Sequence, residues 1–182
     1  MIRKLMSYPV LPAIVLVLAL TGCAPPTSST ETPPVLPGGA SLKIRTGTYF
    51  GMCLGYCVTE VSIAPRKGAS ASDLGATAVV TRASNLRDDP DYPILVDEVP
   101  MADDVWASLV RETEEHLDAF FALDETLGCP DCADGGGEWV ALSVDERTNR
   151  VDFEFGASIP EIDGLLERIR EVRSDLVDRV ES

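Results

Sequence analysis

The residues of this chain best suited to chemistry are its five cysteines. Four of them form two close pairs, Cys53 with Cys57 and Cys129 with Cys132, and Cys23 stands apart near the N-terminus. Paired thiols at these spacings can form disulfides, bind a metal ion as thiolates or exchange electrons with another thiol. Which of these applies depends on the compartment of the protein and on the elements that hold the pairs.

The N-terminal segment has the pattern of an export signal. Arg3 and Lys4 precede an apolar run over residues 10–20. This run is shorter than the roughly 20 residues of a transmembrane helix and is typical of a signal-peptide core. It ends in Leu20-Thr21-Gly22-Cys23, which resembles the lipobox of bacterial lipoproteins. The resemblance implies cleavage before Cys23 and acyl chains on its thiol and new amino group. An ordinary secretory signal that happens to end in a cysteine is the alternative.

Compartment and charge limit the partners of the protein. A lipid on Cys23 implies an extracytoplasmic protein of the cell envelope that is attached to a membrane by that lipid. No other cofactor is expected. Ala24 in place of Asp implies the outer membrane in a cell with two membranes. The chain has 15 basic and 30 acidic side chains, a net charge of −15. This excess argues against nucleic acid, because phosphate contacts need clustered Lys and Arg.

Composition divides the 182 residues into three parts. Residues 1–22 are the expected signal peptide. Residues 23–40 hold the lipidated cysteine and a tether rich in Pro, Ser and Thr, a composition typical of semi-flexible spacers. Residues 41–182 carry the periodic apolar patterns, and their length suits a single domain.

The expected order of elements in the domain is β-β-β-α-β-β-α. Alternating apolar residues predict three strands, then a hairpin, and i, i+3, i+4 spacing predicts two helices. Pro and Asp prohibit regular structure over most of 88–100. Gly128 suits the end of the first helix, and Ser158-Ile159-Pro160-Glu161 reads as a capping box that opens the second. The strands are expected over Leu42–Thr48, Cys57–Ile63, Ala76–Arg82, Glu138–Val144 and Arg150–Phe155, and the helices over Asp103–Leu127 and from Ser158 to the C-terminus.

This pattern predicts an α+β fold. Strands in adjacent pairs with short loops favour an antiparallel sheet of about five strands. Each helix has one apolar stripe, so both helices are expected to pack on the same face of that sheet.

The cysteine pairs lie in two recognisable segments. Phe50-Gly51-Met52-Cys53-Leu54-Gly55-Tyr56-Cys57 and the run from Cys129 to Trp139 are similar to motifs of an uncharacterised family of secreted and lipid-anchored bacterial proteins. The resemblance covers residues from about Ile44 to the last helix, and it implies a fold without an activity. An even number of cysteines in an exported domain predicts disulfides, and four cysteines allow three connectivities.

Two other uses of the four cysteines remain open. Together they could form a four-thiolate zinc site, and Met52 could join soft ligands for Cu(I). A reactive thiol pair normally lies at a helix N-terminus, which lowers its pKa. Cys129 instead follows a predicted helix C-terminus, with Asp131 and Asp134 nearby, and both influences raise a thiol pKa. A redox centre is therefore disfavoured.

The remaining candidate residues give weaker signals. His116 is the only histidine, and a surface or half-buried role is favoured over catalysis. Two acidic runs, residues 88–91 and Asp131 to Glu138, lack the spacing of a known calcium loop and predict solvated turns. Trp106 and Trp139 are expected in the core or on a sheet face.

The expected function is therefore a lipid-anchored envelope protein whose domain is a non-catalytic module. It would bind an envelope protein or a small ligand, or act as a scaffold. The alternative is an extracytoplasmic metal-binding or thiol-redox protein that uses Cys53, Cys57, Cys129 and Cys132.

Overall fold

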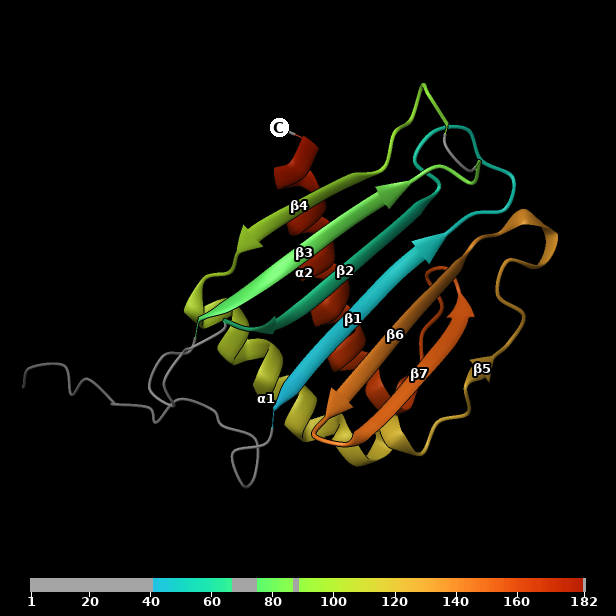
Figure 1. Cartoon of the computed structure of the whole chain (residues 1–182). Helices are drawn as coiled ribbons and strands as arrows, with labels where there is room; N and C mark the ends of the chain where they lie inside the picture. Colours follow the sequence, from blue (N-terminus) through green and yellow to red (C-terminus); the bar gives the residue numbers. More distant parts are fainter. Residues whose placement is uncertain (1–40, 67–74, 87–88, 182) are drawn as a thin grey trace, which may run out of the picture. The chain divides into compact units, whose positions relative to one another are not determined.

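A computed structural model describes residues 41–66, 75–86 and 89–181. The expected signal peptide, Cys23 and the tether lie outside these residues. Within them, two long helices cover one face of a single sheet (Figure 1). None of the described helices is long and apolar enough to cross a membrane. The elements are β1 (Leu42–Tyr49), β2 (Val58–Pro65), β3 (Ala76–Ala83), β4 (Leu95–Pro100), α1 (Asp103–Phe121), β5 (Thr126–Leu127), β6 (Gly137–Val144), β7 (Arg147–Glu154) and α2 (Asp163–Glu181).

The sheet has seven strands in the order β4-β3-β2-β1-β6-β7-β5. All neighbouring strands are antiparallel except β5, which pairs in parallel with β7. The α+β class is confirmed, whereas the sheet is mixed and has more strands than the five expected. The two additional strands, β4 and β5, lie at the two edges.

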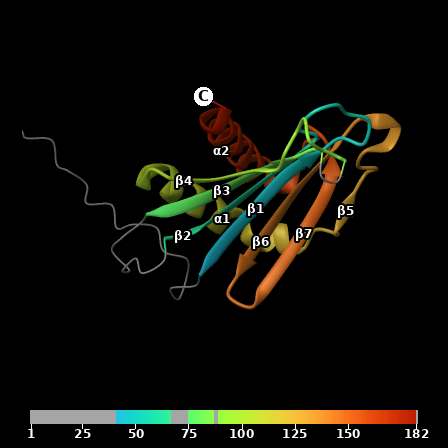
Figure 2. The same cartoon turned by 45° about the horizontal axis from the view of Figure 1, so that its top comes forward.

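Period-two alternation separates the faces of the sheet. The register aligns Thr46 with Val61 and Val140, and all three side chains are buried beneath the helices. The opposite face carries polar residues and has no helix over it (Figure 2). The core between sheet and helices includes Ile44, Ile63, Val80, Leu142, Val151 and Phe153 from the strands and Leu109, Phe120, Leu165, Leu166 and Ile169 from the helices.

Strand β4 corrects the expectation for residues 88–100. It pairs only with β3, and most of its side chains are exposed, so it lacks the apolar alternation that marks a half-buried strand. Pro93 precedes it and Pro100 ends it. Prolines are tolerated at these positions because an edge strand needs hydrogen bonds on one side only.

The first helix ends earlier than expected. Helix α1 stops at Phe121, and the residues predicted to be its last turn form β5 instead. The side-chain amide of Asn149 donates hydrogen bonds to the carbonyls of Phe120 (3.1 Å) and Leu123 (3.3 Å). These bonds add to the backbone bonds at the C-terminus of the helix, which ends at the cap residue Ala122 without a glycine.

The expected capping box does not form. A short 3₁₀ turn, Pro160–Ile162, comes first, and α2 starts at Asp163. Ser158 therefore precedes the helix by five residues, and its hydroxyl donates to the carboxylate of Asp163 (2.9 Å). The apolar stripe of α2 is buried as expected, and its members include Leu165, Leu166, Ile169, Val172 and Leu176.

Candidate functional site

Both cysteine pairs are disulfides, and both lie at the same end of the sheet. Cys53 is bonded to Cys57 in the β1–β2 loop, and Cys129 is bonded to Cys132 between β5 and β6. The register places the last residue of β1 opposite Gly137, the first residue of β6, so the two loops leave the sheet side by side (Figure 1). The prediction of disulfides is confirmed, with the two local connections. We call the described loop residues 50–57, 84–86 with 89–94, and 128–136 together the disulfide end.

Side-chain hydrogen bonds tie the three loops of the disulfide end together. The amide of Asn85 donates to the carbonyls of Phe50 (2.6 Å) and Gly51 (3.0 Å). One carboxylate oxygen of Asp131 accepts from the backbone N–H groups of Gly51 (3.3 Å) and Gly136 (3.1 Å). Asp131 lies between the bonded cysteines with φ of 59°, a left-handed conformation that Asp adopts more readily than most residues. Each loop thus holds the next in place.

Two aromatic contacts stiffen the same region. The ring of Phe50 packs edge-on against Phe155, with centroids 5.0 Å apart. Tyr56 packs edge-on against Tyr92 at 5.6 Å, and the guanidinium of Arg82 lies 4.8 Å from the Tyr56 centroid. Such contacts each add about 0.5–1.5 kcal/mol beyond area burial. The disulfide end is therefore braced by ring packing as well as by covalent and hydrogen bonds.

Large apolar side chains are exposed mainly on these braced loops. Met52 is 80% exposed and Leu54 is 98% exposed, both beside the first disulfide. Seven large hydrophobic residues are exposed in the described chain, and five of them belong to the disulfide end. Phe155 packs against Phe50 of that end, and only Val96 lies apart from it. The others are Leu86, Tyr92 and Ile94 in the β3–β4 loop. Scattered exposed apolar residues need no explanation, whereas a concentration at one place marks an interaction surface.

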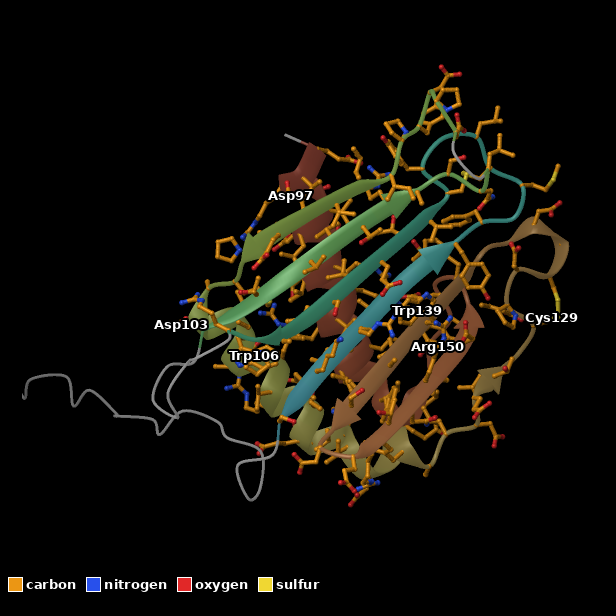
Figure 3. The ribbon with its side chains drawn as sticks, in the orientation of Figure 1. Asp97, Asp103, Trp106, Cys129, Trp139 and Arg150 are labelled. Carbon is orange, nitrogen blue, oxygen red and sulfur yellow. A yellow bond between two sulfur atoms is a disulfide. The ribbon has the colours of Figure 1, made fainter. Side chains whose placement is uncertain are left out.

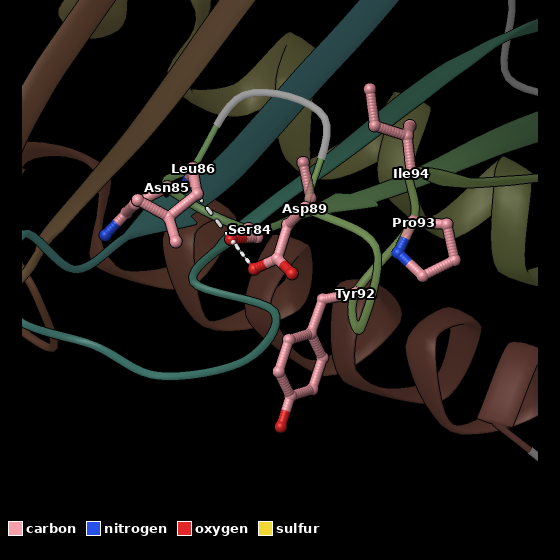
Figure 4. Close-up of a pocket in the computed structure, with 8 residues that line it drawn as sticks. Ser84, Asn85, Leu86, Asp89, Tyr92, Pro93 and Ile94 are labelled. Atoms are coloured by element: carbon pink, nitrogen blue, oxygen red, sulfur yellow. Dashed lines mark hydrogen bonds between the residues drawn. The ribbon is translucent and has the colours of Figure 1, made fainter.

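An open pocket of about 540 Å³ lies within the β3–β4 loop (Figure 4). Leu86, Tyr92, Pro93 and Ile94 supply most of its apolar wall. Its polar contribution includes Asp89, whose carboxylate accepts a hydrogen bond from the hydroxyl of Ser84 (2.9 Å). The residues that line it include no histidine, lysine or cysteine that could serve as a base or nucleophile beside that serine. The pocket suits an apolar side chain better than a reaction.

Aromatic rings lie over glycines on the uncovered face of the sheet. Gly47 is the cross-strand partner of Trp139, and a Cβ atom on Gly47 would come within 2.7 Å of the indole nitrogen. Gly137 is likewise the partner of Tyr49, whose ring occupies the space of a Cβ there. Aromatic residues stabilise a sheet in this way where a glycine leaves the backbone bare. Burial, followed by the carboxylates of Asp152 and Asp131, raises the pKa of Tyr49.

Trp139 also lies between two arginines. The guanidinium of Arg150 stacks 4.0 Å from the indole centroid and that of Arg45 lies at 5.5 Å, as Figure 3 shows for Trp139 and Arg150. Each arginine is bonded to a carboxylate, Arg150 to Asp152 and Arg45 to Glu60, both at 2.7 Å. The hydrogen bonds that Arg150 donates to the carboxylate of Asp152 raise the pKa of the guanidinium. This cluster is internally paired, so it explains the burial of Trp139, with 5% of its surface exposed, without a ligand.

A buried ion cluster that was not predicted from the sequence lies between the sheet and α2. Glu138 is fully buried and accepts hydrogen bonds from Arg170 (2.7 Å) and Arg173 (2.6 Å) of α2. Arg173 also donates to the hydroxyl of Thr46 (2.7 Å), and Arg170 to the carbonyl of Ala157 (2.7 Å). Burial alone would raise the pKa of Glu138, but the two arginines outweigh it and hold that pKa below its usual value. Glu138 therefore does not share a solvated turn with Asp131, contrary to the expectation for that acidic run.

The other candidates have structural surroundings. His116 is half-buried on α1, with Nδ1 2.9 Å from the carbonyl of Glu112. Trp106 is buried in the core. Asp89 accepts bonds from Ser84 and from the N–H of Asp91, while Asp88 lies outside the described residues. No group of three or more His, Cys, Asp or Glu side chains within the described ranges is arranged to hold a metal ion. Binding of a metal ion by the four cysteines would first require reduction of the two disulfides.

Comparison with known proteins adds no family to this description. No protein-family model matches the chain, and no curated protein matches it.

Proposed function

We propose that the chain is a lipid-anchored, extracytoplasmic protein of the cell envelope whose domain is a non-catalytic binding module. The disulfide end is its binding surface. The observation that carries this proposal is the concentration of exposed large apolar side chains on loops that are braced by two disulfides.

The bracing favours binding because it lowers the entropy that a partner must remove. Ordering a loop on association costs about 0.5–1.5 kcal/mol for each side chain immobilised, and a surface held in place beforehand avoids part of that cost. Leu54 is 98% exposed between Cys53 and Cys57, so the first disulfide presents an apolar side chain that nothing else in the described domain covers.

The proposed surface lies at the far end of β1 from the residue at which the tether joins the domain. The tether from Cys23 joins the domain at Ser41, directly before the start of β1. The disulfide end begins after Tyr49, at the other end of that strand, which is eight residues long. Eight strand residues span about 27 Å. Ser41 and the proposed surface therefore lie at opposite ends of β1.

A photo-crosslinking residue at Leu54, compared with one at Glu146, tests this proposal in intact envelopes. Both positions are exposed, and Glu146 lies in the β6–β7 turn at the opposite end of the sheet. We expect a discrete crosslinked species with the Leu54 variant and none with the Glu146 variant after irradiation. Equal crosslinking at both positions, or none at Leu54, would contradict a binding surface at the disulfide end.

A further inference from the structure

The outer edge of the sheet at β4 has backbone groups that no described strand pairs with. Met101 donates its N–H to the carbonyl of Ala76 (3.1 Å), and the register continues from there along β3 and β4. Hydrogen-bonded pairs alternate along an antiparallel ladder. Asp97 therefore bonds toward β3 with its backbone, while the N–H and C=O groups of Val96 and Glu98 point outward. The N–H of Glu98 donates to the Oδ1 atom of Asp97 (2.9 Å), so an added strand must displace that carboxylate at this position. No described strand lies beyond β4.

Apolar side chains accompany these outward groups. Val96 is 65% exposed on the uncovered face of the sheet, and Ile94, 66% exposed, comes directly before β4. Ile94 also lines the pocket in the β3–β4 loop, together with Tyr92 and Pro93 (Figure 4). A strand added beside β4 would therefore extend past an apolar pocket of about 540 Å³. Backbone pairing with side-chain pockets beside it is how proteins bind extended peptides at sheet edges.

The negative charge of this edge favours a partner segment that carries positive charge. Residues 89–100 contain four carboxylates and no lysine or arginine. Asp97 and Glu98 are exposed on β4 itself (Figure 3 labels Asp97). A second copy of β4 would place like charges opposite each other, which destabilises cross-strand pairs and is one way in which proteins protect an edge from self-association. A segment with Lys or Arg would instead place opposite charges across the new pair.

We propose that β4 is the docking strand for an extended segment of a partner protein that alternates apolar residues with Lys or Arg. The segment pairs with the outward backbone groups of Val96 and Glu98 and places an apolar side chain in the pocket beside Tyr92 and Ile94. This proposal rests on the proposed function, because it specifies how the binding module holds its partner.

The experiment uses a phage-displayed library of random 12-residue peptides against the folded domain. We expect the selected peptides to be enriched in Lys and Arg together with apolar residues. The strongest synthetic peptide should slow hydrogen exchange at the amides of Val96 and Glu98 by at least tenfold. Its affinity should fall when NaCl is raised, because surface charge pairs are screened by salt.

Two substitutions at one position separate backbone pairing from charge. Glu98→Pro removes an outward N–H together with the charge and leaves the ladder to β3 intact, so it should weaken the peptide at least tenfold. Glu98→Gln keeps the N–H and loses the charge, so it should weaken the peptide about two- to fivefold. If Glu98→Pro fails to fold, hydrogen exchange at Val96 and Glu98 in the unaltered domain tests whether the peptide pairs with β4.

Several results would overturn this proposal. The first is a selection that recovers no binding peptide, or peptides without an excess of Lys and Arg. The second is hydrogen exchange at the amides of Val96 and Glu98 that the peptide does not change. The third is protection of those amides by dimerisation of the domain without any peptide. If the Leu54 crosslink is still observed alongside any of these results, only the docking of a partner on β4 is contradicted, and the proposed binding module is not. Loss of the Leu54 crosslink would remove the binding module itself.

Discussion

Glu138→Gln is expected to lower the free energy of unfolding by about 3–5 kcal/mol, the cost of breaking a buried ion pair on one side. The substitution leaves Arg170 and Arg173 facing a neutral amide in the space between β6 and α2. Both arginines then lose the charge that offsets their desolvation. Chemical denaturation followed by circular dichroism measures the change, which should appear as a lower midpoint with an unaltered slope.

Glu60→Gln is the matched control. Glu60 also lies on a strand and also pairs with an arginine, but its side chain is 37% exposed and that of its partner Arg45 is 42% exposed. Exposed pairs contribute at most about 1 kcal/mol. Equal losses for the two variants would contradict a special role for burial. Adding Arg173→Met to Glu138→Gln should recover part of the loss, since one of the two arginine charges left without a carboxylate partner is then removed.

The same cluster predicts a pH dependence. The pKa of Glu138 is lower in the folded protein than its usual 4.5, so the folded state favours the ionised form. Its contribution is fully present above the unfolded pKa and is lost as the pH falls through the folded pKa. The stability difference between the unaltered protein and Glu138→Gln should therefore be largest near neutral pH and shrink below about pH 4.5. A difference that grows on acidification would contradict this assignment.

Cys23→Ser is expected to abolish the incorporation of labelled fatty acid, because the serine hydroxyl replaces the thiol that we propose as the acceptor of the diacylglyceryl group. The variant should remain unprocessed at its N-terminus or appear in the aqueous phase on detergent partition. The unaltered protein should enter the detergent phase and begin at residue 23 by mass spectrometry. Cys129→Ser is the control, since Cys129 lies in the disulfide end and its loss should leave labelling unchanged. An unaltered protein without lipid, with its N-terminus before residue 23, would contradict the anchor.

Periodicity was enough to predict the strands with one buried face and both helices. Ile44 and Val61 alternate with polar neighbours, and their burial follows from that pattern. Strand β4 has no such pattern because solvent reaches most of its side chains. The two residues of β5 are too few to show any period, and they are a strand only because β7 lies beside them. Edge strands of this kind depend on tertiary contacts that a local pattern does not contain.

The candidate site was predictable only in part. Cysteine count and compartment predicted the disulfides, but no spacing rule brings the β3–β4 loop to the β1–β2 loop, a contact made by Asn85. The Glu138 cluster did carry a signal that was missed. Period two places Glu138 on the same face as Val140 and Leu142, and a carboxylate on a buried face needs a cationic partner. Arg173, among the apolar residues of α2, is that partner.

The most direct test of a binding surface at the disulfide end is the oxidation of Met52 in intact envelopes. After the expected cleavage, Met52 and Met101 are the only methionines, and they are 80% and 5% exposed. In the purified domain, dilute peroxide should convert Met52 to the sulfoxide much faster than Met101. If the disulfide end is occupied in the envelope, oxidation of Met52 should be slowed severalfold there while that of Met101 stays the same. Met52 that is oxidised as fast in the envelope as in the purified domain would contradict the account.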